Sequence, residues 1–360
     1  MKKYVKAALA LEDGTYIEGK LFGAERNAIG EIVFCTSMTG YVEALTDPSY
    51  KGQILMLTYP LIGNYGVCKE DFESDSVKVE GFVVRELCKE PSNFRSQMTV
   101  DELLKSYNIP GIEGVDTRML TRKIRIFGSM KAAIGIDVDK EELIKIARNQ
   151  PSITEIDLVD KVCVKEPKII DVKGKYNVVL IDCGVKMSII RQLIKRGINL
   201  IVVPYNFPAK KIMEMNPDGV FISNGPGDPA RVRETIETIR NLIGKIPLAG
   251  ICLGHQLIAL AFGAKTFKLK FGHHGSNQPT KDLESGRVFI SSQNHNFSVD
   301  EKTLPKGFEV TQINLNDYTI EGLRHNDMPI ITVQYHPEAG PGPHDTYFFF
   351  DRFLDILREG

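Results

Sequence analysis

The stretch Gly250-Ile251-Cys252-Leu253-Gly254-His255-Gln256 decides the expected fold of this chain. It follows the apolar run Ile246–Ala249 and precedes a second apolar run, Leu257–Phe262, an order that predicts a strand, a one-residue turn and a helix. Glycines two positions before and two positions after the turn residue permit a sharp bend that exposes its side chain. Because a thiol at a helix N-terminus lies in a positive local field, the pattern predicts that Cys252 is a nucleophile.

The composition of the 360-residue chain is that of a soluble globular protein with two domains of ordinary size, since 42% of the residues are hydrophobic and 25% are charged. The formal net charge of −1 gives no electrostatic reason to expect binding to nucleic acid or to an anionic membrane. No apolar run approaches the roughly 20 residues that a membrane span needs. The N-terminus Met1–Lys6 lacks the apolar core of a signal peptide, so we expect a cytoplasmic protein.

The six cysteines include no C-x-x-C pair, which argues against a zinc knuckle or a redox dithiol. The cysteines expected to be small buried residues are Cys35, Cys68, Cys88, Cys163 and Cys183. The neighbouring His273 and His274 have no third ligand at a suitable spacing, so we interpret them as surface or interface residues. The chain is therefore expected to hold no metal.

The first half of the chain alternates short β-like runs with turns and helical patterns, which predicts an α+β domain. The expected strands are Val5–Leu11, Tyr16–Leu21, Glu31–Thr36, Gln53–Thr58 and Val77–Val84, and the expected helices are Val100–Tyr107, Asp116–Ile126 and Lys140–Asn149. The charged stretch Val162–Lys175 contains Pro167 and Gly174 and is interpreted as a linker. The two domains are therefore expected to span residues 1–170 and 175–360.

The second half has another rhythm, in which apolar runs without alternation are separated by helical patterns. Such runs predict a parallel sheet that is covered by helices on both faces. The expected strands are Tyr176–Asp182, Ile198–Val203, Gly219–Ser223 and Pro247–Ile251, and the expected helices are Lys186–Arg196, Ala209–Met215, Arg231–Ile243, Leu253–Phe262 and Asp345–Arg358. The later strands, expected to be antiparallel or mixed, are Arg287–Ser291, Glu309–Gln312, Thr319–Arg324 and Ile330–Tyr335.

A cysteine nucleophile needs a base, and His336 stands at the end of the apolar run Ile330–Tyr335. Open α/β sheets present functional groups at the carboxyl ends of their strands. Pro337 favours an extended conformation at His336, and residues i and i+2 of an extended segment face the same side. We therefore expect Glu338 to orient the His336 imidazole. His255 is a less suitable base, because its side chain points along the helix away from the sulfur.

The anionic intermediate of such a reaction needs backbone N–H donors. The amide of Leu253, which follows the nucleophile, is the expected first donor. The second is expected from Gly225 in the loop Ser223–Pro229, because a glycine lets its amide approach a ligand closely. That loop also matches the dinucleotide-binding pattern G-x-G-x-x-A, but its prolines remove amides and Asp228 would repel a pyrophosphate, so we reject that interpretation. No G-x-x-x-x-G-K-[ST] motif occurs, which argues against ATP binding by this chain.

Three motifs, SNGPGD at 223–228, GICLGHQ at 250–256 and HPE at 336–338, resemble those of the class I glutamine amidotransferases. Other segments are similar to the small-subunit family of carbamoyl phosphate synthetases. These segments are TSMTGYVE at 36–43, LTDPSYKGQ at 45–53, YPLIGNYG at 59–66, VDTRMLT at 115–121 and KFGHHG at 270–275. The resemblance implies a flavodoxin-like class I amidotransferase domain, with a mostly parallel sheet, after an α+β small-subunit domain.

The resemblance also implies that the chain hydrolyses L-glutamine, with Cys252 as nucleophile, His336 as base and Glu338 as its orienter. The ammonia would pass to a large subunit, which binds ATP and magnesium and makes carbamoyl phosphate from bicarbonate for arginine and pyrimidine biosynthesis. This chain itself would hold no cofactor. The implied glutamine-binding residues are Ser49, Gly225, Gly227, Leu253, Gln256, Asn294, Asn296 and Phe297, of which Gly225 and Leu253 form the oxyanion hole. Asn296 departs from the family, whose members often carry glycine there.

Three alternatives remain open on the sequence. A glutaminase that serves another synthase, such as those for anthranilate, GMP or CTP, is opposed by the motifs of the first half. A free-standing cysteine hydrolase or peptidase predicts activity on peptides or polyglutamates without a partner. A non-catalytic assembly subunit is opposed by the presence of Cys252, His336 and Glu338 together.

Overall fold

The computed structural model describes residues 5–359 and divides the chain into two compact units. Unit 1 extends to Ile156 and includes Lys270–His274, and unit 2 comprises Asp157–Leu269 and the chain from Gly275 onward. Residues 1–4, on which the expected lack of a signal peptide partly rests, lie outside the described residues. No helix within residues 5–359 combines the length and the apolar character that crossing a bilayer requires.

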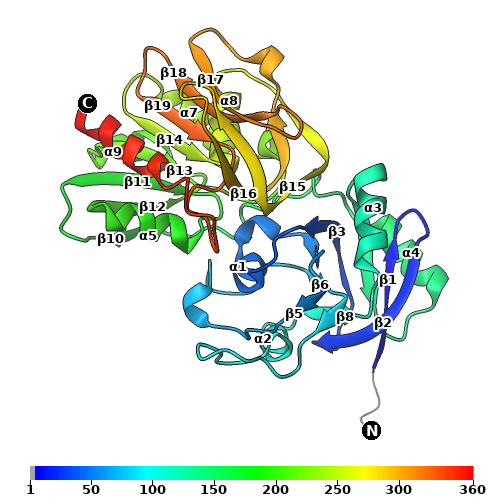
Figure 1. The fold of residues 1–360 in the computed structure, drawn as a ribbon. Helices are drawn as coiled ribbons and strands as arrows, with labels where there is room; N and C mark the ends of the chain where they lie inside the picture. The colour runs from blue at the N-terminus through cyan, green and yellow to red at the C-terminus, as the bar shows by residue number, and fades with distance from the viewer. Residues whose placement is uncertain (1–4, 360) are drawn as a thin grey trace. The chain divides into compact units, whose positions relative to one another are not determined.

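Unit 1 is built around a closed β-barrel with the strand order β1-β2-β8-β6-β4-β3-β9 (Figure 1). Its strands are β1 Lys6–Leu11, β2 Tyr16–Gly23, β3 Ala28–Cys35, β4 Gln53–Leu57, β6 Gly81–Val83, β8 Pro110–Glu113 and β9 Met130–Gly135. A separate pair consists of β5 Leu61–Ile62 and β7 Glu86–Leu87. Strands β1, β2 and β9 pair antiparallel, whereas β3, β4 and β6 run parallel.

Local sequence signals account for the helices of unit 1, which are α1 Tyr41–Thr46, α2 Val100–Ser106, α3 Thr117–Phe127 and α4 Lys140–Asn149, with 3₁₀ turns η1 Pro48–Tyr50 and η2 Lys69–Asp71. Thr99 and Glu102 form a capping box at α2, and the Asp116 carboxylate accepts the Met119 N–H at the start of α3. Leu120 and Ile124 of α3 are fully buried in the barrel core. This packing leaves the opposite face of α3 exposed.

Unit 2 contains a ten-stranded sheet with the order β10-β12-β11-β13-β14-β19-β18-β17-β15-β16. Its strands are β10 Lys168–Ile170, β11 Tyr176–Asp182, β12 Ile198–Pro204, β13 Gly219–Ile222, β14 Leu248–Ile251, β15 Thr266–Asp282, β16 Val288–Val299, β17 Phe308–Asn314, β18 Ile320–His325 and β19 Ile330–Val333. The central strands β12-β11-β13-β14-β19 run parallel. In chain order they are second, first, third, fourth and fifth, which is the flavodoxin-like arrangement.

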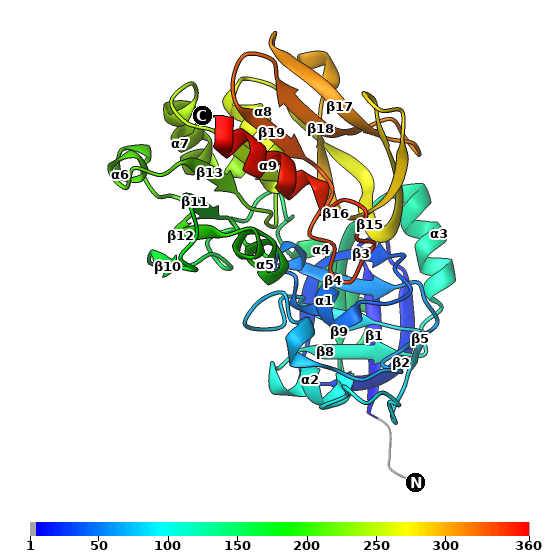
Figure 2. The same ribbon diagram turned by 60° about the vertical axis from the view of Figure 1, so that its left-hand side comes forward.

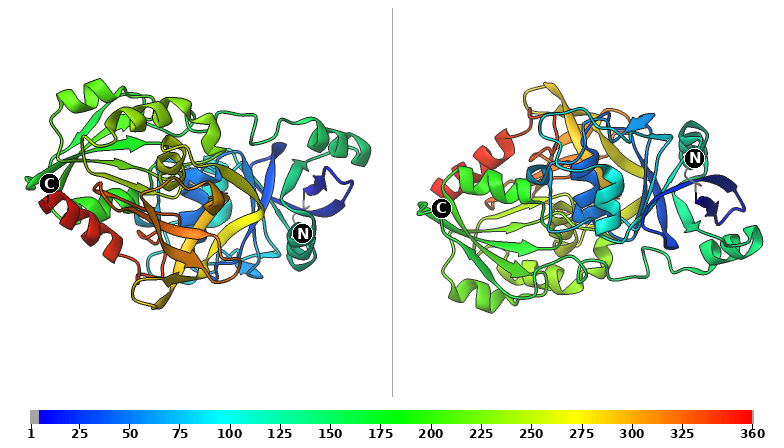
Figure 3. Two further views of the ribbon diagram at one scale, coloured as in Figure 1. Left: turned by 90° about the horizontal axis from the view of Figure 1, so that it is seen from above. Right: turned by 90° about the horizontal axis from the view of Figure 1, so that it is seen from below.

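Helices cover both faces of this sheet, as Figures 2 and 3 show. The helices are α5 Met187–Lys195, α6 Ala209–Glu214, α7 Arg233–Leu242, α8 Leu253–Ala261 and α9 Phe348–Glu359, and the 3₁₀ turns are η3 Pro229–Arg231 and η4 Glu301–Thr303. Side chains of α5 and α9 share one buried cluster with Phe221, and those of α6, α7 and α8 share another with Val220. The predicted α/β fold is confirmed, with a parallel central part of the sheet, whereas the strands that flank this part pair antiparallel, as the later strands were expected to do.

The boundary between the units differs from the predicted linker Val162–Lys175. Residues from Asp157 onward belong to unit 2, because Val159 and Cys163 are buried in its core and β10 pairs antiparallel with β12. The segment Lys270–His274 belongs to unit 1, although the prediction placed residues 175–360 in one domain. The charged composition of the expected linker concealed these apolar contacts.

Two other expectations are wrong. His273 and His274, expected at the surface or an interface, are buried, and the His274 ring stacks on Tyr50 at 5.9 Å between centroids. The Val77–Val84 strand is confined to β6, Gly81–Val83. All six cysteines are free; Cys88 is half-buried, whereas the other five are buried.

Candidate active site

Cys252 lies at the single-residue turn between β14 and α8, as the sequence predicts. Its backbone has φ 54° and ψ −104°, a conformation that is strained for a residue with a side chain. A methyl group on Gly250 would lie 2.7 Å from the Gly254 carbonyl oxygen, and one on Gly254 would lie 2.2 Å from that of Ile222. The two glycines are therefore required by close approach, and the Cys252 N–H donates to the Val333 carbonyl at 2.8 Å.

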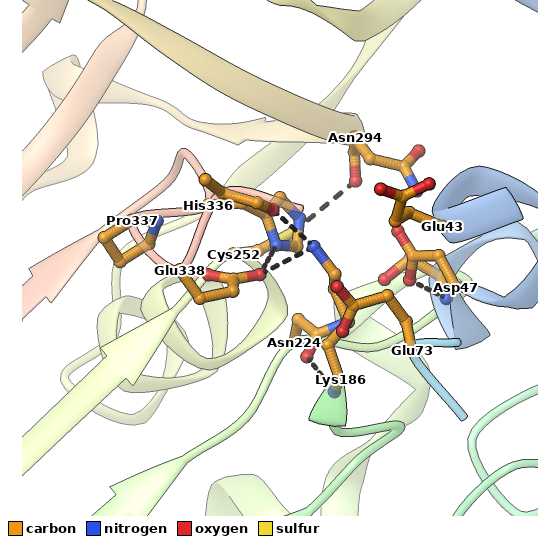
Figure 4. Close-up of polar contacts among 12 residues, drawn as sticks. Glu43, Asp47, Glu73, Lys186, Asn224, Cys252, Asn294, His336, Pro337 and Glu338 are labelled. Carbon is orange, nitrogen blue, oxygen red and sulfur yellow. Dashed lines mark hydrogen bonds and ion pairs between the residues drawn. The ribbon is translucent and has the colours of Figure 1, made fainter. Parts of the chain in front are cut away.

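His336, Glu338 and Cys252 form one buried cluster at the carboxyl ends of β14 and β19 (Figure 4). The Nδ1 atom of His336 lies 2.5 Å from Glu338 Oε1, which fixes the ring. The Cys252 Sγ lies 3.6 Å from the Asn294 carbonyl oxygen of β16. Because Nδ1 is held by Glu338, Nε2 is the ring nitrogen available to reacting groups.

Lys186 extends this cluster from the turn between β11 and α5. Its Nζ lies 3.0 Å from Glu338 Oε1 and donates to the Ala339 carbonyl at 2.8 Å, and the residue is only 3% exposed. The turn itself is held by Asp182, whose carboxylate accepts N–H groups from Gly184 and Val185. The sequence analysis missed Lys186, and its only local signal is its place at the end of a parallel strand.

Opposite charges set the protonation of the cluster. Burial alone would raise the pKa of Glu338, but Lys186 and then His336 lower it to about 2. Burial alone would lower the pKa of His336, but the charges of Glu338 and Cys252 raise it to about 10. The arrangement therefore favours a carboxylate beside an imidazolium, which can supply a proton to a leaving group.

The expected oxyanion donors lie beside each other. A methyl group on Gly225 would lie 2.1 Å from the Cys183 carbonyl oxygen and 2.8 Å from Leu253 Cδ2, so only glycine fits between them. The Ser223 hydroxyl holds the neighbouring loop, accepting the Cys183 N–H at 2.9 Å. Gly227 lies further along the same loop with φ 88°, and a methyl group there would face Leu158.

The expected glutamine-binding residues of α8 and β16 are linked by a hydrogen bond. Gln256 Nε2 donates to the Phe297 carbonyl at 2.7 Å and to Gln334 Oε1 at 2.9 Å. Gln334 is a second residue that the sequence analysis missed, although it lies two positions before His336. Asn296 is half-buried within β16 and has no positive φ, so it does not use the left-handed conformation that asparagine tolerates.

Two further candidates have hydrogen-bond partners outside the cluster. Ser49 lies in unit 1, in turn η1, where its N–H donates to Asp47 Oδ1 at 2.8 Å. His255 is fully buried, and its Nδ1 lies 2.8 Å from Thr332 Oγ1. Burial lowers the pKa of His255 to about 3, which makes the ring a weaker base than an ordinary imidazole.

Comparisons with known proteins agree with both sets of motifs. The family "Carbamoyl-phosphate synthase small chain, CPSase domain" matches residues 9–134, and "Glutamine amidotransferase class-I" matches residues 179–356. A carbamoyl phosphate synthase small chain from Archaeoglobus fulgidus is 80% identical over 356 residues, which cover 99% of each chain. The small chain from Methanocaldococcus jannaschii is 55% identical in an alignment that covers 98% of this chain and 99% of the relative. The small chain from Methanopyrus kandleri is also 55% identical, and the alignment covers 99% of this chain and 100% of the relative.

The chain belongs to the carbamoyl phosphate synthase small chain family. The predicted resemblance is thereby confirmed, and this small chain is an enzyme subunit with a glutamine amidotransferase domain in unit 2. The part that matches the CPSase domain lies within unit 1.

The depressed pKa of Glu338 predicts how the stability of this small chain varies with pH. The stabilisation that the carboxylate contributes should be complete above pH 4.5 and should decline as the pH falls toward 2, by about 1.4 kcal/mol per pH unit. Chemical unfolding of the wild type and of Glu338→Gln between pH 7 and pH 3 measures this difference. A difference that stays constant below pH 4.5 would contradict the coupling of Glu338 to Lys186.

Proposed function

We propose that this small chain hydrolyses L-glutamine to glutamate and ammonia through a thioester on Cys252, and that it delivers the ammonia to a large chain. The large chain would use ATP, magnesium and bicarbonate to make carbamoyl phosphate for arginine and pyrimidine biosynthesis. In this proposal the small chain itself uses no cofactor. The observation that carries the proposal is the buried cluster of Cys252, His336 and Glu338 at the carboxyl ends of parallel strands.

The chemistry follows from the cluster. The Cys252 thiolate attacks the side-chain amide carbon of glutamine, and the Leu253 and Gly225 amides stabilise the oxyanion. The His336 imidazolium gives its proton to the departing ammonia, and the neutral ring then takes a proton from the water that hydrolyses the thioester. Glu338 and Lys186 keep the ring oriented throughout.

The testing experiment is to combine the full-length small chain with its large chain and to measure carbamoyl phosphate formation with glutamine or with ammonium as nitrogen source. Glutamine-dependent synthesis is expected only when both chains are present. Hydrolysis of peptides or polyglutamates by the small chain alone, with no glutamine-dependent synthesis, would support the free-standing hydrolase instead.

We propose that Gln334 fixes the orientation in which the Gln256 amide group faces the substrate. The Phe297 carbonyl and Gln334 Oε1 engage the Gln256 amide nitrogen, so its oxygen is the atom left to face a ligand. An amide oxygen is an acceptor, and the α-ammonium group of glutamine is a suitable donor.

Replacing Gln334 by leucine is expected to raise the KM for glutamine about tenfold with little change in kcat. The variant leaves the Gln256 amide free to rotate, so its oxygen no longer faces the substrate. The binding free energy that is lost should be about that of one hydrogen bond to a charged group, and it is lost from the ground state and the transition state alike. Steady-state glutaminase assays measure both constants. Gln192→Leu on α5 is the control and should leave KM unchanged, and a fall in kcat at constant KM would contradict the assignment.

A further inference from the structure

The exposed face of helix α3 carries an unusual concentration of positive charge. The helix contains Arg118, Arg122, Lys123 and Arg125 and no acidic residue, although the whole chain has 45 basic and 46 acidic residues. Lys123 is engaged by Asp13 at 2.6 Å. Within residues 5–359, no ion pair or hydrogen bond engages the other three guanidinium groups, which are all exposed.

Two of the three arginines, Arg118 and Arg122, are placed where the isolated helix gains nothing from them. Arg118 is separated from Arg122 by four positions and Arg122 from Arg125 by three, so neighbouring like charges repel. Arg118 also lies in the first turn, where the helix dipole disfavours a cation. Only Arg125, in the last turn, has a favourable position within the helix.

Apolar side chains accompany these arginines on the exposed surface. Met119 is 40% exposed, Ile126 is 52% exposed and Phe127 is 70% exposed. An ordinary solvated helix face mixes charges of both signs and places its apolar residues inward. Arginines interleaved with exposed apolar side chains are instead the composition of a protein–protein contact.

We propose that the α3 face, defined as Arg118, Met119, Arg122, Arg125, Ile126 and Phe127, docks an acidic surface of the large chain. This proposal rests on the proposed function, which requires such a partner. Carboxylates of the partner would pair with the arginines and relieve their repulsion, and apolar side chains of the partner would cover Phe127 and its neighbours. A two-fold contact between copies of this chain would instead bring the same arginines together, which like-charge repulsion disfavours.

The experiment measures the affinity of the full-length small chain for the large chain, with Arg122→Glu as the central variant. The dissociation constant is expected to rise at least about tenfold at about 0.05 M salt, and the difference should shrink at about 0.5 M salt. Lys145→Glu, the same charge reversal on the exposed side of α4, is the matched control and should stay within about twofold of the wild type. Phe127→Ser should weaken binding at both salt concentrations, because apolar burial is not screened.

The folding of the variant is checked by thermal unfolding. A glutamate at position 122 would face Arg118 and Arg125, so Arg122→Glu should unfold no earlier than the wild type. Weakened binding without lost stability supports the docking surface.

Three results would overturn the proposal. A dissociation constant for Arg122→Glu equal to that of Lys145→Glu would show that the α3 face does not contact the large chain. A change confined to self-association of the small chain, measured by sedimentation, would assign the face to a second copy. If the wild-type small chain binds a duplex oligonucleotide and Arg122→Glu loses this binding but still binds the large chain, the α3 face would be assigned to nucleic acid. A wild-type small chain that forms no complex at all would instead contradict the proposed function, before any α3 variant is compared.

Discussion

Replacing Cys252 by serine should lower glutamine-dependent carbamoyl phosphate synthesis by at least about 10³-fold while leaving ammonium-dependent synthesis intact. A serine hydroxyl is far less acidic than a thiol, so the side chain at position 252 would not be converted into the anion that attacks the amide. Losing the nucleophile of a catalytic cluster removes most of its rate enhancement. The proposed oxyanion donors and glutamine-binding residues are unaffected by the change, so substrate binding should persist.

The measurement compares the two nitrogen sources in the complex of small and large chains. Cys88→Ser is the matched control, because it makes the same chemical change at a half-buried cysteine of unit 1, and it should leave both activities unchanged. Glutamine-dependent synthesis that survives Cys252→Ser would show that another group attacks the substrate. Loss of the ammonium-dependent activity as well would point to a disrupted complex.

Strong local patterns made much of unit 2 predictable. Tyr176–Asp182 is a strand with the predicted bounds, because its continuous apolar run can be buried on both faces only in a parallel sheet. The turn at Cys252 was predictable from its flanking glycines. In a strand–turn–helix of this kind the backbone at Gly250 and Gly254 packs too closely against its neighbours to leave room for a side chain. His336 and Glu338 followed from their place after a strand.

Other elements depend on contacts distant in the sequence. Strand β15, Thr266–Asp282, was missed because its lysines, histidines and glycines show no alternation, and its neighbours in the sheet are β17 and β16. Strands β8 and β9 were missed for a related reason, since they become strands by closing the barrel against β2 and against β1 and β3. Lys186 was missed because only the order of the parallel strands brings its turn to the end of β19.

Lys186→Met is expected to destabilise the small chain by about 3–5 kcal/mol, the usual consequence of leaving one partner of a buried ion pair without the other. Lys186 and Glu338 are both almost fully buried, and Lys186 is the first of the charges that lower the pKa of Glu338. Without the ammonium group, the pKa of Glu338 should rise. The carboxylate, still ionised near neutral pH, would then pair with His336 alone, so the pKa of His336 should rise as well.

The distinguishing measurement combines chemical unfolding with the pH dependence of glutaminase activity. Lys195→Met removes an exposed lysine from the same helix region and should change stability by less than about 0.5 kcal/mol. A purely structural lysine would lower stability and leave the pH profile in place. A positioning lysine should also move the alkaline limb of the profile to higher pH, because the variant lacks the cation that shares Glu338 with His336 and the carboxylate then holds the proton on His336 more strongly. If Lys186→Met and Lys195→Met behave alike in both measurements, Lys186 does not support the cluster.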